Sequence, residues 1–296
     1  MKHRVATLTL LLPDLSRVEK MPGLAQWLAR GDRLPEAKPG REVLLRDSFE
    51  FIGTSLPVAA LTRSLDAGDA PGAMWLRADP AYAIADAVTA RLMACGDIGL
   101  SQIESDELAR TLRPLFGDAG FPLEPATPSR WYLRCPPGAR PPQFAAPDSM
   151  LGDDLMRHLP SGDNERQWRH LFNEAQVILH NHPVNARRAQ RGQVPANTLW
   201  FWGAGKLPDW VRAPYTRVAS EDEVTIALAK SAKIAVVERK AVLAELGPTE
   251  SVLIDADAVP QLGTAKFKTI DLRFASGERV RYKSWHRVRF WRRARA

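Results

Sequence analysis

The segment from His180 to Pro208 concentrates side chains that bind anions, and it contains no aspartate or glutamate. Arginine guanidinium groups and asparagine amides hold several N–H donors in fixed directions, which suits phosphate or carboxylate oxygens. A cation would find no carboxylate within this segment. The sequence therefore predicts a binding site for a small anion, and it assigns no catalytic residue and no metal ligand. The predicted binding residues are His180, His182, Asn185, Arg187, Arg188, Arg191, Asn197, Gly203, Gly205 and Lys206.

Each of these residues also has a structural interpretation. Arginines on a polar loop are often only solvated, and His180 at a helix C-terminus could serve to neutralise the helix dipole. Asn185 and Asn197 could bond their own backbone in turns. Trp200 and Trp202 alternate with another aromatic residue, which is typical of a strand in or beside the core. The joint occurrence of the whole set within one short segment favours the anion site.

Two sharper motifs do not fit the segment. Gly203-Ala-Gly-Lys206 follows a β-prone run, as a phosphate-binding loop would. It lacks the leading glycine of such loops, however, and has Leu207 where Ser or Thr should bind magnesium. His180 and His182 are one residue apart, yet no acid or thiol lies near them in the sequence to complete a metal site. We therefore expect neither a P-loop nor a metal centre, and no cofactor.

Alternating strands and helices would position this segment. Val5–Leu12 predicts a buried strand that ends before Asp14, and Ser251–Asp255 predicts a second strand that ends in carboxylates. Helices are predicted over residues 22–30, 82–93, 105–116, 163–180 with Asp163 as N-cap, and 221–232 with Ser220 as N-cap. Residues 268–274 and 279–285 predict a C-terminal β-hairpin. This alternation favours an α/β fold with a mostly parallel sheet flanked by helices, in which ligands bind at the carboxyl ends of the strands.

Residues 136–147 carry five prolines in twelve positions, which excludes a regular helix or an interior strand there. We therefore predict a linker over residues 136–149. It would separate an N-terminal α/β region, residues 1–135, from a second α/β region, residues 150–275, that carries the anion-site motif. Residues 276–296 would form a basic hairpin and tail.

The composition of the 296 residues, 45% hydrophobic and 25% charged, is that of an ordinary globular protein. No apolar run is long enough to cross a bilayer. The N-terminal apolar run ends at Pro13-Asp14 without the cleavage site of a signal peptide. Cys95 and Cys135 form no CxxC pair, so reduced thiols are expected. These features predict a cytoplasmic protein that does not bind membranes.

The net charge of +7 comes from the C-terminus. Residues 279–296 hold eight bases and no acid, while the other 278 residues sum to −1. Tyr282, Trp285, Phe290 and Trp291 lie among these bases, a mixture that can stack nucleic-acid bases and hold phosphates. A basic strand is equally expected at a solvated sheet edge, where charge prevents pairing with other strands. Nucleic acid is therefore an alternative partner, ranked below the small anion.

The central segment resembles archaeal-type cofactor-independent phosphoglycerate mutases of the alkaline phosphatase superfamily. Their corresponding stretch is roughly H-P-V-N, R, G, P-A-N, then a strand and G-x-G. The matching residues are His182-Pro-Val-Asn185, Arg188, Gly192, Pro195-Ala-Asn197 and Gly203-Ala-Gly205. Residues 21–31 are similar to a superfamily helix that usually has the sequence T-P-N-L-D-x-L-A-x-x-G. Taken whole, the chain resembles the RpfE-type regulatory proteins of proteobacteria, which are often labelled phosphoglycerate-mutase-like.

The resemblance implies an alkaline-phosphatase-like fold. In the enzymes of the superfamily it also implies two divalent metals held by several Asp and His ligands, with a Ser or Thr nucleophile. This chain has six histidines, and after His182 only His286 remains. Asp14 would be a remnant ligand, Ser16 a remnant nucleophile, and Asp255-Ala-Asp257 a second carboxylate pair. The interpretation of each as an ordinary turn or strand-end residue ranks above these roles.

Two-metal phosphoryl transfer needs the complete ligand set. We therefore expect a non-catalytic or degenerate phosphoglycerate-mutase-like regulatory protein, a pseudoenzyme that binds a small phosphorylated or carboxylated metabolite. The alternative is an active metal-dependent 2,3-bisphosphoglycerate-independent phosphoglycerate mutase or phosphatase with an unusual ligand set.

Overall fold

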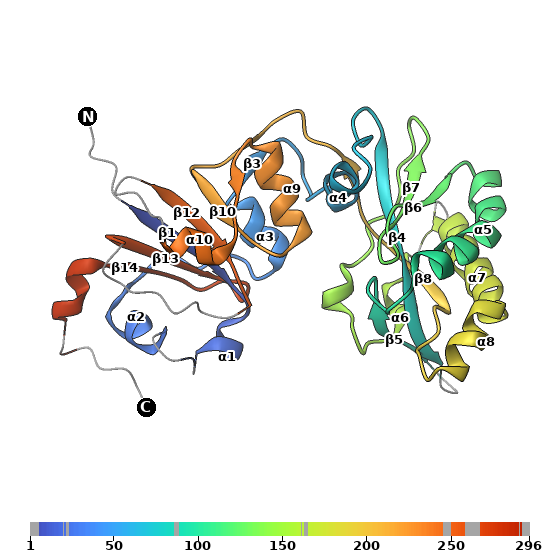
Figure 1. Ribbon diagram of the computed structural model, residues 1–296, viewed down its shortest axis with the longest axis horizontal. Coiled ribbons are helices and arrows are strands. Elements are labelled where there is room, and N and C mark those ends of the chain that lie inside the picture. Colours follow the sequence, from blue (N-terminus) through green and yellow to red (C-terminus); the bar gives the residue numbers. More distant parts are fainter. Residues whose placement is uncertain are drawn as a thin grey trace. The chain divides into compact units, whose positions relative to one another are not determined.

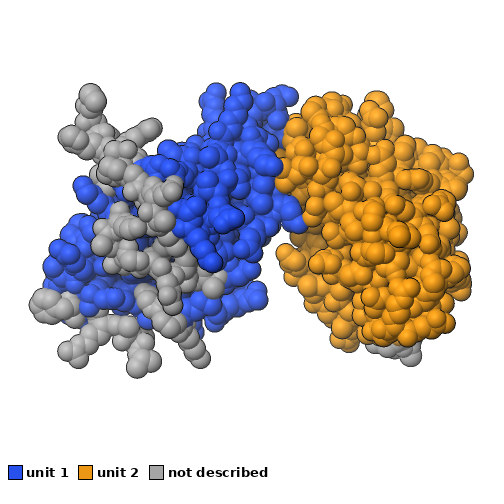
Figure 2. Space-filling model, viewed as in Figure 1, with its two compact units in different colours: residues 1–55, 208–296 blue, residues 56–207 orange. Residues whose placement is uncertain are grey.

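The computed structural model describes residues 6–19, 21, 24–85, 89–160, 162, 165–244, 250–257, 267–289 and 291. The chain divides into two compact units, which are coloured separately in Figure 2. Unit 1 comprises Met1–Ser55 and Pro208–Ala296, and unit 2 comprises Leu56–Leu207. Unit 2 is therefore an insertion within the sequence of unit 1. No helix in the described ranges is both long enough and apolar enough to cross a membrane.

Unit 1 is built on a seven-stranded sheet in the order β11-β10-β12-β1-β13-β14-β2 (Figure 1). Its strands are β1 (Thr7–Leu12), β2 (Asp32–Arg33), β10 (Arg217–Ala219), β11 (Ala235–Val236), β12 (Ser251–Asp255), β13 (Thr269–Phe274) and β14 (Arg279–Lys283). The first five strands in the sheet order are parallel, and β14 and β2 are antiparallel additions at one edge. The predicted α/β fold with a mostly parallel sheet is confirmed in this unit, and β13 with β14 forms the predicted C-terminal hairpin.

The central position of β1 explains its sequence. The strand pairs with β12 on one side and β13 on the other, and Leu8, Leu10 and Leu11 are fully buried. A parallel strand covered on both faces has a continuous apolar run rather than an alternating one. The other elements of unit 1 are α1 (Leu15–Val18), α2 (Leu24–Arg30), α3 (Arg41–Arg46), α9 (Glu223–Ser231), α10 (Arg239–Ala244), the pair β3 (Glu50–Phe51) and β9 (Val211–Arg212), and a 3-10 helix (Ser284–Val288).

Unit 2 contains an antiparallel sheet around one long strand, β4 (Met74–Ala85). β4 pairs with β5 (Ala90–Cys95), β7 (Trp131–Cys135) and β8 (Thr198–Lys206), and β6 (Leu123–Pro125) pairs with β7. The helices of unit 2 are α4 (Val58–Asp66), α5 (Gln102–Asp118), α6 (Leu155–His158), α7 (Arg166–His180) and α8 (Pro183–Gln190), with a 3-10 turn at Pro147–Ser149. Figure 1 shows α4 on one face of this sheet and α5 and α7 on the other.

Each face of the unit 2 sheet buries its own apolar cluster. On the α4 face, Trp75 and Tyr132 pack with Ala59. On the α5 and α7 face, Phe116 and Phe201 belong to a larger cluster, and their rings meet edge to face at 6.0 Å. Neighbouring residues of β4 divide between the two clusters, with Trp75 on the α4 face and Leu76 on the other, as the period of two in a strand requires.

The helix predicted over residues 82–93 is wrong. Residues 74–85 continue as β4, and residues 90–95 form β5, which pairs with it in an antiparallel hairpin. The run of small apolar residues is compatible with either period, and pairing with β8 and β5 selects the strand. The predicted helices at 105–116 and up to 180 are confirmed as α5 and α7; Asp163 lies outside the described residues.

The chain does not divide where the prolines predict. The boundaries between the units fall at Ser55/Leu56 and Leu207/Pro208, and residues 136–149 lie inside unit 2. This proline-rich segment packs on the unit 2 core, because Pro147 is buried and the indole of Trp200 donates a 2.9 Å hydrogen bond to the Ala145 carbonyl. Proline removes backbone donors without preventing burial, so its density marks irregular backbone rather than a domain boundary here.

Candidate functional site

The carboxyl edge of the parallel sheet in unit 1 gathers polar residues. β10 is followed by Ser220, β12 ends at Asp255, and β1 is followed two residues later by Asp14. Because β1, β10 and β12 are parallel, these residues follow the strands at one edge of the sheet, where ligands bind in open α/β folds. Of the three, Asp255 is the buried one and forms the centre of a cluster.

The Asp255 carboxylate has a donor on every side. Arg41, the first residue of α3, donates from Nη1 to Oδ1 at 2.8 Å and from Nη2 to Oδ2. Thr225 and Ser220 donate their hydroxyls to Oδ2 at 2.8 and 2.9 Å. The Arg41 Nη2 also lies 3.2 Å from Asp222 Oδ2. A guanidinium group thus occupies the position between two carboxylates.

The start of α9 differs from the sequence prediction. The N-cap is Asp222 rather than Ser220, since the Asp222 carboxylate accepts the backbone N–H of Thr225 at 2.8 Å. Ser220 instead accepts the N–H of Asp222 at 3.0 Å and donates its hydroxyl to Asp255. The turn before α9 therefore connects the helix cap directly to the Asp255 cluster.

Arg41 holds Asp255 in its charged form. Burial of Asp255, which is 8% exposed, would raise the pKa of its carboxyl group. The hydrogen bonds and charge of Arg41, with the hydroxyls of Thr225 and Ser220, outweigh burial and hold the pKa below its ordinary value. In turn, Asp255 and Asp222 raise the pKa of Arg41 despite desolvation. The buried negative charge therefore already has its counter-ion within the protein.

The donor set at this edge does not fit the two divalent metals that the resemblance implies. Within the described ranges, no group of three or more His, Cys, Asp or Glu side chains could hold a metal ion. Asp14, Ser16 and Asp257 are exposed. The oxygens of Asp255 accept hydrogen bonds from protein donors, so a cation would have to displace Arg41.

Arg188, the central residue of the predicted anion site, is fully buried and binds protein atoms with every guanidinium nitrogen. Its Nε donates to the Val194 carbonyl at 2.9 Å, Nη1 to Gly99 at 3.0 Å, and Nη2 to Ile98 at 2.7 Å. Nη1 also donates to the Glu104 carboxylate at 3.1 Å. The segment 180–208 contains no acid, but α5 supplies one. We therefore correct the interpretation of Arg188 to that of a clamp joining α8, α5 and two loops.

Asn185 and Asn197 also have structural positions. The Asn185 amide donates to the carbonyls of Leu179 and Ala196 and accepts the Ala196 N–H, so it joins the end of α7 to the approach to β8. The Asn197 amide exchanges two hydrogen bonds with the backbone of Ala83 in β4, at 2.8 and 2.9 Å. Both side chains replace backbone pairing where the chain is irregular.

Gly203 and Gly205 belong to β8 rather than to a phosphate loop. A Cβ at Gly203 would lie 2.8 Å from Val58 Cβ, and one at Gly205 would lie 2.4 Å from Pro57 Cβ. Gly203 also has a φ of +67°, a conformation that favours glycine. These glycines therefore let the start of α4 lie directly on β8.

The predicted binding residues are divided between the two ends of β8. Asn197 directly precedes the first residue of β8, Thr198, and Lys206 is its last residue. The eight residue steps from Thr198 to Lys206 correspond to about 26 Å of strand, which separates Asn197 from Lys206. Figure 1 shows α8 at one end of β8 and α4 at the other. The set therefore does not converge on one cavity, which corrects the single site expected from the sequence.

The remaining predicted residues lie on or beside α7 and α8. Arg187 pairs with Glu107, and Arg191, whose side chain is 59% exposed, lies 3.4 Å from Glu104. His182 caps α8 by accepting the N–H of Val184 at 3.2 Å. Burial, with the charge of Arg187, lowers the pKa of His182 in spite of Glu107. His180 and Lys206 are exposed.

The basic C-terminal segment is partly neutralised. Arg279 pairs with Asp47, Arg281 with Asp271 at 2.6 Å, and Arg289 with Asp32 at 2.7 Å. These acids lie outside residues 279–296, so the sequence count overstated the free charge. Residues 290 and 292–296, which carry Phe290 and three of the arginines, lie outside the described residues.

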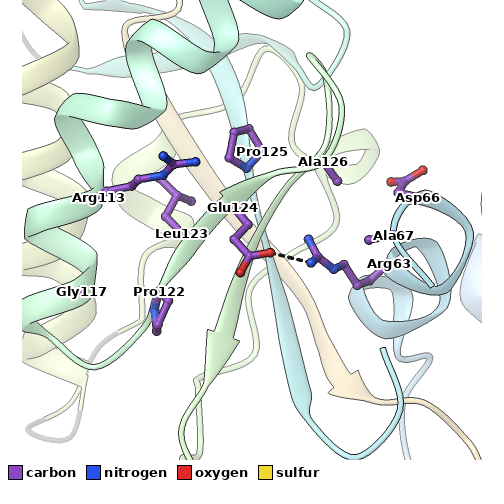
Figure 3. A pocket seen from close by; sticks show the side chains of 10 residues that line it. All are labelled: Arg63, Asp66, Ala67, Arg113, Gly117, Pro122, Leu123, Glu124, Pro125 and Ala126. Atoms are coloured by element: carbon purple, nitrogen blue, oxygen red, sulfur yellow. Dashed lines mark hydrogen bonds and ion pairs between the residues drawn. The ribbon is translucent and has the colours of Figure 1, made fainter. Parts of the chain in front are cut away.

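Unit 2 contains a pocket that sequence reasoning missed. We call it the α4–α5–β6 pocket; its volume is about 650 Å³. Its lining residues, drawn in Figure 3, are Arg63, Asp66, Ala67, Arg113, Gly117, Pro122, Leu123, Glu124, Pro125 and Ala126. Arg63 and Glu124, which form an ion pair at 2.5 Å, are 61 residues apart in the sequence. No local pattern marks such a pair, so only the folded chain could reveal it.

The chain is similar in sequence to several phosphoglycerate mutases over part of its length. No family model matches it. It is 32% identical over 109 residues to a probable 2,3-bisphosphoglycerate-independent phosphoglycerate mutase of Geobacter sulfurreducens, covering 37% of this chain and 27% of that protein. It is 38% identical over 66 residues to the 2,3-bisphosphoglycerate-independent phosphoglycerate mutase of Methanothrix thermoacetophila, covering 22% of this chain and 17% of that enzyme. The chain thus spans about a quarter or less of the length of these relatives, and the matched part is homologous to them.

Among solved structures, the cofactor-independent phosphoglycerate mutase of Thermoplasma acidophilum aligns with a TM-score of 0.39 at 16% identity, covering 95% of this chain and 90% of that chain. The PH0037 protein of Pyrococcus horikoshii aligns with a TM-score of 0.43 at 16% identity, covering 86% and 71%.

Proposed function

We propose, from the partial homology to 2,3-bisphosphoglycerate-independent phosphoglycerate mutases, that this chain is a mutase-like binding protein. It binds a small phosphorylated or carboxylated metabolite without metal and performs no phosphoryl transfer. A regulatory role, as expected from the resemblance to RpfE-type proteins, is part of the same proposal. The observation that carries it is the Asp255 carboxylate, held by Arg41, Thr225 and Ser220.

Metal-dependent phosphoryl transfer requires cations that contact both the attacking and the leaving oxygen. Such a cation needs carboxylate oxygens with free lone pairs and an open coordination position. A guanidinium group supplies positive charge and directed hydrogen bonds, but it cannot coordinate a water or lower the water's pKa. The Arg41–Asp255 pair therefore supports a protein that stabilises this edge of the sheet without a metal.

A ligand and activity screen tests the proposal. The thermal midpoint of the full chain would be measured with 3-phosphoglycerate, inorganic phosphate and citrate, each with EDTA or with manganese. We expect at least one of these anions to raise the midpoint equally in both conditions. Phosphoglycerate mutase and phosphatase turnover would be assayed in parallel with Mg²⁺, Mn²⁺, Co²⁺ and Zn²⁺, and no turnover is expected.

The alternative is an active metal-dependent mutase or phosphatase, which the names of the relatives favour. Turnover that requires a divalent metal and disappears in Asp255→Asn or Asp14→Ala would establish it and overturn the proposal. The proposal would also be overturned if the chain bound none of these anions, because it states that the ligand belongs to this class. Arg17→Ala, which changes an exposed residue on α1, is the matched control for the Asp255 and Asp14 variants and should leave any turnover unchanged.

A further inference from the structure

The α4–α5–β6 pocket has the size and lining of a small-molecule site. Its volume of about 650 Å³ lies within the range of ligand pockets in proteins. Pro122, Leu123, Pro125 and Ala126 supply apolar surface, while two arginines and two acids supply charge. Figure 3 shows Arg113 from α5 and Arg63 from α4 on either side, with Glu124 between them.

Most of the charge in the pocket is already neutralised. The oxygens of Asp66 accept from Arg130 Nη2 and Nε, both at 2.7 Å, and from the Tyr132 hydroxyl at 2.5 Å. Arg63 donates from Nε and Nη2 to Asp69, both at 2.6 Å, and from Nη2 to Glu124 Oε2 at 2.5 Å. Asp66 therefore has little capacity left for a ligand, and the positive charge of Arg63 is offset by two carboxylates, which leaves one negative charge at Asp69 and Glu124.

Three functional groups on the pocket wall still have free hydrogen-bonding capacity. Arg113 is exposed and has no ion pair within the described part of the chain. The hydrogen bonds of Arg63 to described residues run from Nε and Nη2, so its Nη1 has no partner among them. Glu124, whose side chain is 47% exposed, uses Oε2 for Arg63 and keeps Oε1 as an acceptor. Arg113 is thus the lining cation that has no carboxylate partner among the described residues, and its positive charge balances the second carboxylate on Arg63.

Arg63 is also fixed in direction. Its side chain is only 5% exposed, and its guanidinium lies 4.4 Å from the ring centroid of Trp75 and 5.4 Å from that of Tyr132. Cation–π contacts of this kind, together with the ion pairs to two carboxylates, fix the orientation of the guanidinium plane. A ligand that binds Arg63 Nη1 would therefore not have to order a mobile side chain.

We propose that this pocket binds a small hydroxylated anion, a phosphate ester or a hydroxy-carboxylate. Arg113 binds the anionic group, Arg63 Nη1 is a second N–H donor, and a ligand hydroxyl donates to Glu124 Oε1. The apolar wall contacts the carbon skeleton. This inference rests on the proposed function and gives it a location in unit 2, away from the residues predicted from the sequence.

Calorimetric titration of the full chain with 3-phosphoglycerate tests this assignment. Arg113→Gln is expected to weaken binding about tenfold, the effect of losing one charge-assisted contact. Arg110→Gln is the matched control, because Arg110 is an exposed residue of the same helix that does not line the pocket, and its affinity should stay within about twofold. Glu124→Gln removes a negative charge beside the bound anion and keeps one of the two acceptor oxygens, so it should strengthen binding.

A second ligand tests the hydroxyl contact. 3-(Phosphonooxy)propionate has the same chain, carboxylate and phosphate ester as 3-phosphoglycerate and lacks only the hydroxyl, so it should bind the wild type more weakly. Opposite changes in Arg113→Gln and Glu124→Gln support the pocket, because general damage to the fold would weaken both. Equal affinities of Arg113→Gln and Arg110→Gln for a ligand that the wild type binds would overturn the pocket and leave the proposed function standing. If the wild type binds no anion, the proposed function fails first.

Discussion

Removing Arg41 is the most informative perturbation of unit 1. In Arg41→Ala, Asp255 stays buried and keeps the hydroxyls of Thr225 and Ser220, but it loses the cation that binds both of its oxygens. Breaking a buried ion pair costs about 3–5 kcal/mol. The Arg41 side chain is 37% exposed, and two hydrogen bonds remain, so a smaller loss applies. We expect the free energy of unfolding to fall by about 2 kcal/mol at pH 7.

The pH dependence follows from the direction of the pKa shift. Because the folded pKa of Asp255 lies below its unfolded value, the wild-type pair stabilises the fold fully above that unfolded value and loses this contribution as pH falls through the folded pKa. In Arg41→Ala, burial without the cation should raise the folded pKa of Asp255 instead. The difference between variant and wild type should therefore be largest near pH 7 and shrink as pH approaches about 4, the ordinary value for aspartate.

Urea unfolding followed by circular dichroism at several pH values measures this difference. Arg17→Ala serves as the control, since Arg17 is exposed. Adding Asp255→Asn to Arg41→Ala should restore part of the lost stability at pH 7, because the unpaired charge is removed. The reasoning is refuted if Arg41→Ala is as stable as the control at pH 7, or if its deficit grows on acidification.

Three further predictions concern unit 2. Arg188→Met should lower the free energy of unfolding in urea by about 3 kcal/mol, because the buried carbonyls that Arg188 binds lose their donor. Arg187→Met, which breaks a half-exposed ion pair, should cost less than about 1 kcal/mol. Equal losses in the two variants would contradict the role of Arg188 as a clamp. Gly203→Ala should lower the thermal midpoint more than Gly192→Ala. Both glycines have a positive φ, but of the two only Gly203 has neighbouring atoms, from Val58 and Ala59, where a Cβ would lie. The reverse order of midpoints would exclude the close approach of α4 to β8. Burial raises the pKa of Cys135 to about 12. DTNB should therefore label this thiol slowly at pH 8 in the native state and quickly in urea, because the thiolate is the reactive form. Fast labelling of Cys135 in the native state would show that the thiol lies at the surface.

Local sequence patterns were sufficient for most of the elements that form unit 1. The apolar run before Asp14 and the run ending at Asp255 predicted β1 and β12, and the residues around Ser276-Gly277 predicted the hairpin. These signals are reliable because burial on both faces, strand period and turn chemistry act over a few consecutive residues. The helix predicted over residues 82–93 failed because its small apolar residues fit both periods, and pairing with β8 selected a strand.

The sequence also predicted which side chains in the segment 180–208 have the chemistry to bind an anion. It did not predict which of them are free to bind a ligand. Arg188 has the chemistry of an anion ligand, and Glu104, 84 residues earlier, neutralises it. Asp255 has the chemistry of a metal ligand, and Arg41, 214 residues away, neutralises it. Coulomb energy and hydrogen bonding depend on distance in space, which has no fixed relation to separation along the chain. For this protein, composition and spacing specify which groups could bind an ion, and folding specifies which of them already have a partner.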